Sequence, residues 1–102
     1  MAQSVIWSAE SLEDIESIAA FISRDSVHHA QRVVAEIISI VETIQTQPEM
    51  GRVVPELKNT RIREHFIYSY RIIYEIKLEQ IHILAVIHGG RLLETVADRF
   101  KR

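Results

Sequence analysis

Basic side chains recur in the second half of the sequence at the alternating spacing of a β-strand. Arg61, Arg63 and His65 are two residues apart and therefore share one face of a predicted strand. Arginine can bind an oxyanion through paired hydrogen bonds, and histidine can exchange a proton near neutral pH. Cleavage of RNA by attack of a 2′-hydroxyl needs a base, an acid and a cation. The candidate catalytic residues for such a reaction are Arg61, Arg63, Arg71 and His88.

Each of these side chains also has a structural interpretation. Arg61 and Arg63 can pair with acidic helix residues or lie in solvent. Arg71 can anchor a carboxylate of a partner or of the C-terminal segment. His88 ends a predicted strand, where a hydrogen-bonded histidine is common. The residue types alone leave both interpretations open.

Other kinds of site find no support in the sequence. The chain has no cysteine, which excludes disulfides and thiolate nucleophiles. His28 and His29 are adjacent and point in different directions on a helix, and no set of His, Asp and Glu has metal-ligand spacing. There is no Gly-x-Ser-x-Gly motif and no glycine-rich phosphate loop. We therefore expect no metal and no cofactor.

Two helices in the first half must help to position the basic residues. Ser8 is a natural N-cap for a helix that ends near Arg24, and Ser26 caps a second helix of about five turns that continues to Pro48. The short break between them predicts an antiparallel hairpin. Apolar residues recur at helical spacing in both segments. They are Leu12, Ile15, Ile18, Ala19 and Ile22, then Ala30, Val33, Val34, Ile37, Ile40, Val41 and Ile44.

Strand signals occupy most of the remainder. Segments 5–7, 61–66, 70–77 and 81–87 read as strands, the last of them central because it is apolar on both sides. Residues 48–51 predict a turn and 53–60 a loop, since Pro55 is poor in a ladder. After Gly89 and Gly90 the spacing indicates a short C-terminal helix, on Leu92, Leu93, Val96, Ala97 and Phe100.

The order of these elements predicts an α+β fold, β-α-α-β-β-β, in a single domain over residues 1–102. The helical hairpin packs on one face of a small twisted antiparallel or mixed sheet. We expect the other face to stay partly open and the basic side chains of the late strands to converge on it.

Composition indicates a globular protein with uneven charge. Residues 1–50 carry two basic and eight acidic side chains, whereas residues 51–102 carry ten basic and six acidic ones. This asymmetry favours an anionic partner for the second half, or else two independently solvated surfaces. No segment has the length of a membrane helix or the character of a signal peptide, so we expect a cytoplasmic protein with no membrane partner.

An apolar channel is expected beside the long helix. Its candidate lining is Ile37, Val41, Met50, Val53 and Val54. A partner's amphipathic helix or extended peptide would fill such a channel. Alternatively, these side chains close the core by themselves.

Several of these segments, in this order, resemble the RelE/ParE toxin superfamily. The Pro48–Leu57 segment is similar to the family's Pro-x-x-Gly-Arg turn and loop, and Arg63-Glu64 to its Arg-Glu strand. The other matching segments are Trp7-Ser8 with Leu12–Ile15, Phe21-Ile22, Tyr70–Tyr74 and Ile83–Arg91.

The resemblance implies a toxin–antitoxin operon, a role in growth arrest or plasmid stabilisation, and a tight complex with a partly disordered cognate antitoxin bound at the apolar channel. It also implies one of two activities. RelE-type members cut mRNA on the ribosome, and ParE-type members inhibit DNA gyrase without cutting RNA.

The ParE branch is the favoured interpretation. The lysine-rich run of RelE-type members is missing, and a net charge of −2 is unlike a ribosome-binding protein. The expected target-binding residues are then Arg71, His88, Arg91, Arg99 and Phe100. The alternative is an mRNA endonuclease that uses Arg61, Arg63, Arg71 and His88, and a third hypothesis is a non-toxic relative that binds DNA or protein.

Overall fold

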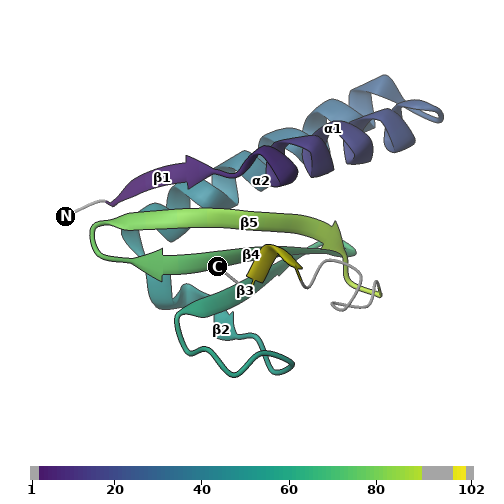
Figure 1. The fold of residues 1–102 in the computed structure, drawn as a ribbon. Helices are drawn as coiled ribbons and strands as arrows, with labels where there is room; N and C mark the ends of the chain where they lie inside the picture. The colour runs from purple at the N-terminus through teal and green to yellow at the C-terminus, as the bar shows by residue number, and fades with distance from the viewer. Residues whose placement is uncertain (1–2, 91–97, 101–102) are drawn as a thin grey trace.

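The computed structural model describes residues 3–90 and 98–100. The order of elements is β1 (Ser4–Trp7), α1 (Ala9–Ser23), α2 (Val27–Thr46), η1 (Pro48–Met50), β2 (Arg52–Val53), β3 (Ile62–Ile67), β4 (Tyr70–Lys77) and β5 (Gln80–His88). The α+β class and the helical hairpin on a small sheet are confirmed (Figure 1). Among the described residues, no helix is both long and apolar enough to cross a bilayer.

Both helices begin where the sequence predicts. The Ser8 side chain accepts a hydrogen bond from the Ser11 amide, and Ser26 accepts one from the His29 amide, each at 3.0 Å. These bonds satisfy amides that the first turn of a helix leaves unpaired. Ser8 also donates to the Leu84 carbonyl at 3.3 Å, so this residue joins the start of α1 to β5.

The segment between α2 and β3 is more ordered than the sequence suggests. The predicted turn at residues 48–51 contains the short 3₁₀ helix η1, and residues 52–53, where the expected turn meets the expected loop, form the short strand β2. Arg52 pairs with Glu64 and Val53 with Arg63, antiparallel. A strand of two residues has too little alternation to be recognised from its pattern.

The sheet is mixed and has the strand order β1-β5-β4-β3-β2. Strand β1 runs parallel to β5, whereas the β2–β3, β3–β4 and β4–β5 pairs are antiparallel. The predicted interior position of β5 is confirmed. Strand β1 covers only the first half of β5, since its register ends at the pair Trp7 and Ile83.

Each face of the sheet carries its own apolar cluster. The cluster facing the helices joins Ile37 and Ile44 of α2 to Ile72, Tyr74 and Ile83 of the sheet. Isoleucine residues with no exposed surface at the centre of this cluster explain why α2 packs along its whole length.

The opposite face is covered by the chain itself, which corrects the expectation of an open face. Ile62, Ile73 and Leu84 form a second buried cluster with Val54, and Leu57 and Phe100 pack against it. The loop after β2 and residues 98–100 supply this cover, and residues 98–100 lie on the side away from the helices (Figure 1). The predicted C-terminal helix falls mainly on residues 91–97, outside the described residues.

Candidate functional site

The basic residues of β3 project toward the helices rather than onto the opposite face. Arg63 is opposite Tyr74 in the register and His65 is opposite Ile72, and both partners belong to the helix-side cluster. The carbonyl of Arg61 accepts a hydrogen bond from the Ile76 amide, which continues the same ladder. The predicted sharing of one face by Arg61, Arg63 and His65 is therefore confirmed, but the face is the one that carries the helical hairpin.

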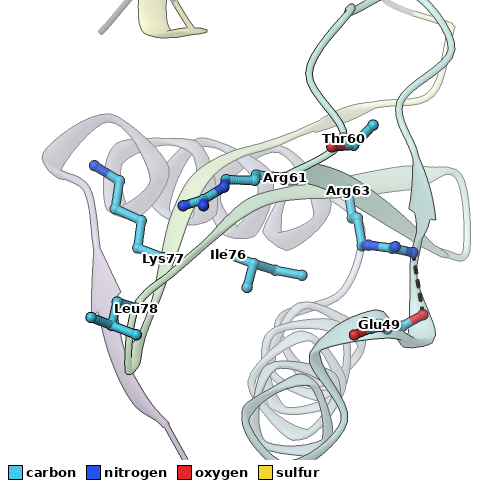
Figure 2. A pocket seen from close by; sticks show the side chains of 7 residues that line it. All are labelled: Glu49, Thr60, Arg61, Arg63, Ile76, Lys77 and Leu78. Atoms are coloured by element: carbon cyan, nitrogen blue, oxygen red, sulfur yellow. Dashed lines mark hydrogen bonds between the residues drawn. The ribbon is translucent and has the colours of Figure 1, made fainter.

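Two of these arginines border a pocket of about 420 Å³ beside the β4–β5 turn. Figure 2 shows it between β3, the end of β4 and η1. Arg63 extends toward η1, where its Nη1 donates to the Gly51 carbonyl at 2.7 Å and to the Glu49 carbonyl at 3.4 Å (Figure 2). The lining residues are Glu49, Thr60, Arg61, Arg63, Ile76, Lys77 and Leu78; we call this the cationic pocket.

Arg71 lies on the other face of the sheet, so the expected convergence of the basic residues is wrong at this position. It is 4% exposed and is held by two carboxylates. Its Nε donates to Glu64 Oε1 at 2.7 Å, a second bond joins Nη2 to the same oxygen, and its Nη atoms reach Glu56 at 3.2 and 3.3 Å. Glu64 also accepts from Arg52 Nε at 2.6 Å. These four side chains form one ion network.

The network explains how a charged arginine can be buried in this sheet. Glu64 is 1% exposed, and burial of its charge without partners would cost free energy. Each of its carboxylate oxygens, however, accepts a hydrogen bond from a guanidinium. The hydrogen bond from Arg71 lowers the pKa of Glu56. Phe66 lies over the network, with its ring centroid 5.4 Å from the Arg52 guanidinium carbon and 5.9 Å from that of Arg71. Arg71 therefore has a structural role, as an anchor for the loop that carries Glu56.

His88 lies at the opposite end of the molecule from the cationic pocket. It is exposed, its ring meets Tyr70 edge to face at 6.0 Å between centroids, and its Nδ1 accepts from the Gly90 amide at 3.2 Å. His88 is paired with Tyr70, whereas Arg61 bonds to Ile76. Tyr70 and Ile76 are six positions apart along β4, roughly 20 Å at about 3.3 Å per residue. The four candidate catalytic residues therefore do not form one site.

Two of the three remaining target-binding candidates, Arg99 and Phe100, lie within the described residues. Arg99 makes a paired salt bridge with Asp14, at 2.7 and 3.2 Å, and its Nη1 also donates to the Leu84 carbonyl at 3.4 Å. Phe100 is half-buried against the far-face cluster. Arg91 lies outside the described residues.

The apolar channel is largely filled by the protein's own packing. Ile37 and Val41 are buried in the helix-side cluster and Val54 in the far-face cluster, so these three side chains close the core. Met50 and Val53 are half-buried and keep some accessible surface. Of the five expected antitoxin-binding residues, these two remain available to a partner in this conformation.

A different apolar groove runs between α1 and the uncovered half of β5. It has a volume of about 340 Å³, and its lining includes Phe21, Tyr70, Val86 and His88. Asp14 of α1 accepts from the Val86 amide at 2.9 Å, so an α1 side chain occupies the edge of β5 where β1 has ended.

Sequence reasoning missed the two acidic residues that organise these regions. Glu64 lies between Ile62 and Phe66 on the strand face that faces the second cluster, and an acid at an inward position could have signalled a buried pair. Asp14 gives no such signal, because its partners are 72 and 85 residues away in the sequence. No described group of three or more His, Cys, Asp or Glu is placed to hold a metal ion.

Comparisons with known proteins agree with this architecture. The sequence model described as "ParE toxin of type II toxin-antitoxin system, parDE" matches residues 5–93. Toxin RelE2 of Caulobacter vibrioides is 30% identical over 93 residues, which cover 90% of this chain and 100% of that protein.

Two solved structures share the fold at low sequence identity. The chromosomal ParDE toxin–antitoxin system from P. aeruginosa contains a chain with a TM-score of 0.70 and 18% identity, over 85% of this chain and 96% of that one. The toxin–antitoxin complex RelBE2 from Mycobacterium tuberculosis gives a TM-score of 0.66 and 15% identity, over 86% and 99% of the two chains.

Proposed function

Because the chain belongs to the ParE toxin family of type II toxin–antitoxin systems, we propose that it inhibits DNA gyrase by binding, without chemistry of its own. A cognate antitoxin neutralises it by direct contact. The proposal extends to this chain an activity of the ParE branch, which its sequence resembles more than the RelE branch.

One observation favours a binding mechanism over RNA cleavage. General acid–base chemistry needs the reacting groups within hydrogen-bond reach of one substrate. Here Arg71 is buried and bonded to Glu56 and Glu64, and roughly 20 Å of β4 lies between Arg61 and His88. These side chains cannot act on one phosphodiester in this conformation.

The working surface that we propose follows β5 from its middle to its C-terminal end at His88. His88 is exposed at the end of β5, whereas Arg99 and Phe100 lie beside Leu84 in the middle of β5, held by Asp14 and by the far-face cluster. Arg91 completes the set that we expect to contact the target. Arg71 is removed from this surface by its burial and instead holds the loop that carries Glu56.

The antitoxin partner is supported by the titles of the two similar structures, both of which name toxin–antitoxin systems. The half-buried Met50 and Val53, beside η1 and β2, are the apolar residues that we propose for this contact. Replacement of both by Ser should weaken capture by the antitoxin encoded beside this gene, while leaving gyrase inhibition intact.

A gyrase assay tests the proposal directly. The purified chain should inhibit supercoiling of relaxed plasmid and trap cleaved DNA, and the double variant His88→Ala/Arg99→Gln should lose both effects. The matched control Arg24→Gln/Arg32→Gln changes two exposed cations on the helical hairpin and should behave as the native chain does. Normal supercoiling at excess native toxin would reject gyrase as the target.

The second candidate is a ribosome-dependent endoribonuclease, which is favoured by the name Toxin RelE2 of a relative 30% identical. A translation extract supplied with the chain would then show mRNA cut at codon positions, and His88→Ala would abolish the cuts. Unimpaired growth of bacteria that express the chain alone would instead favour a non-toxic relative.

A further inference from the structure

The cationic pocket lies at the other end of the sheet from His88, and its Lys77 also lines a neighbouring pocket with Arg99 and Phe100. It adjoins the β4–β5 turn, whereas His88 lies at the far end of β5. Arg61 directly precedes β3, Arg63 belongs to β3, and Lys77 is the last residue of β4. Glu49 is the one acid among the seven lining residues. A local excess of positive charge therefore exists in a protein whose net charge is −2.

From this arrangement we propose that the cationic pocket binds a phosphate group of a nucleic-acid strand. The proposal does not depend on the identity of the toxin's target. It also differs from the ribonuclease hypothesis, since the pocket positions a phosphate and cleaves nothing.

The cations that line the pocket are not neutralised by acids. Among residues 3–90 and 98–100, no carboxylate forms a salt bridge with Arg61, Arg63 or Lys77, although Arg52, Arg71 and Arg99 all have such partners. The positive charge at the pocket is therefore available to an anionic ligand.

Arg63 is prepared for an anion by its surroundings. Its Nη1 is committed to the carbonyls of Gly51 and Glu49, which fixes the direction of the guanidinium. Its Nε is buried without a hydrogen-bond partner among the described residues, and no described carboxylate forms a salt bridge with this guanidinium. An anion in the pocket would therefore meet a positive charge that no described acid neutralises.

The lining suits a phosphate in a nucleic-acid strand. A phosphodiester carries one negative charge on two non-bridging oxygens, and this charge repeats at every nucleotide, so several cations close together can act on neighbouring phosphates. The cationic pocket offers three cations and the Thr60 hydroxyl. Ile76 and Leu78 add an apolar border, and Leu78 is 88% exposed at the turn. An apolar border suits the sugar and base of a nucleotide.

Fluorescence anisotropy with a short labelled single-stranded DNA tests the proposal on the purified full chain. Binding should weaken with added salt, and Arg61→Gln/Lys77→Gln should reduce the affinity roughly tenfold for each cation removed. The slope of log affinity against log salt should fall in magnitude by about 0.7 for each cation removed. Both side chains are exposed, so folding should be unaffected.

Arg24→Gln/Arg32→Gln is the matched control, because it removes the same charge from exposed positions on the helical hairpin. Equal loss of binding in both double variants would overturn the proposal, since attraction would then be general. Titration with inorganic phosphate should shift the NMR signals of Thr60 and Arg63. Stronger competition by a polyglutamate peptide than by phosphate would also overturn it, by assigning the pocket to an acidic protein segment.

Discussion

Gly51 has the least room for a side chain of the three glycines in the sequence. A Cβ atom there would lie 2.5 Å from the Glu64 carbonyl oxygen and 2.6 Å from the Tyr74 hydroxyl. That hydroxyl accepts from the Gly51 amide at 3.0 Å and donates to the Pro48 carbonyl at 2.6 Å. Burial raises the pKa of Tyr74, which keeps the hydroxyl neutral and able to donate. One residue thus joins η1 to the centre of the sheet.

Gly51→Ala should lower the free energy of unfolding by about 1–3 kcal/mol, because the added methyl group overpacks a site closed by backbone. Urea denaturation measures the change. Gly90→Ala is the control, since its Cβ would have its nearest contact at 3.5 Å, an ordinary van der Waals distance. Equal stability of the two variants would contradict the close packing of Gly51.

Glu64 balances two arginines within the sheet. Glu64→Gln should lower the free energy of unfolding by about 3–5 kcal/mol, because it leaves the buried Arg71 with half of its countercharge. The same substitution at the exposed Glu42 should change it by less than about 0.5 kcal/mol. Thermal unfolding of both variants gives the comparison, and a small effect at Glu64 would mean that the network adds little to stability.

At the level of elements, Glu56 fastens the loop that follows β2. Its pKa is lowered from 4.5 by Arg71, so its contribution is present above the unfolded-state value and is lost as the pH falls through the lower folded-state value. Its side chain is 50% exposed, which limits the contribution to less than about 1 kcal/mol.

Comparison of the native chain with Glu56→Gln tests this contribution. Their difference in unfolding free energy should be constant near neutral pH and should shrink below about pH 4.5. A difference that grows with acid would have the wrong sign for a carboxylate with a lowered pKa. Amide exchange in residues 54–61 should be faster in the variant, because the loop loses its attachment.

Asp14 forms the side-chain hydrogen bond that attaches the middle of helix α1 to β5. Asp14→Ala should destabilise the protein by about 1–3 kcal/mol, because the Val86 amide and Arg99 lose their acceptor. Glu13→Ala, at the exposed neighbouring position, should have little effect. If Arg99 belongs to the target-binding surface, Asp14→Ala should also weaken gyrase inhibition under conditions where the variant remains folded.

At the level of the whole molecule, the two clusters share β4 and β5 and should unfold together. Ile37→Val in the helix-side cluster and Ile73→Val in the far-face cluster should each cost about 0.5–1.5 kcal/mol. In both variants, Trp7 fluorescence and far-ultraviolet circular dichroism should report the same midpoint. Separate midpoints would show that the far-face cover unfolds independently of the helical layer.

Local signals in the sequence determined the helices and the long strands. Ser8 and Ser26 cap helices wherever the chain lies, because a cap needs only the amides of the next turn. Alternation over 61–66 and 70–77 likewise grouped the residues of each strand by face. It did not give the register between the strands, and the expected convergence of Arg63 and Arg71 on one face was wrong. The apolar centre of β5 was enough to predict its interior position.

Which face is covered, and by what, was decided only by the tertiary structure. The far face is closed by Val54, Leu57 and Phe100, and Arg71 is buried there because Glu56 and Glu64 come within hydrogen-bond distance. Periodicity assigns a side chain to a face but carries no information about the distant segment that packs on it. The separation of Arg61 from His88, which favours binding over catalysis, likewise depends on strand register.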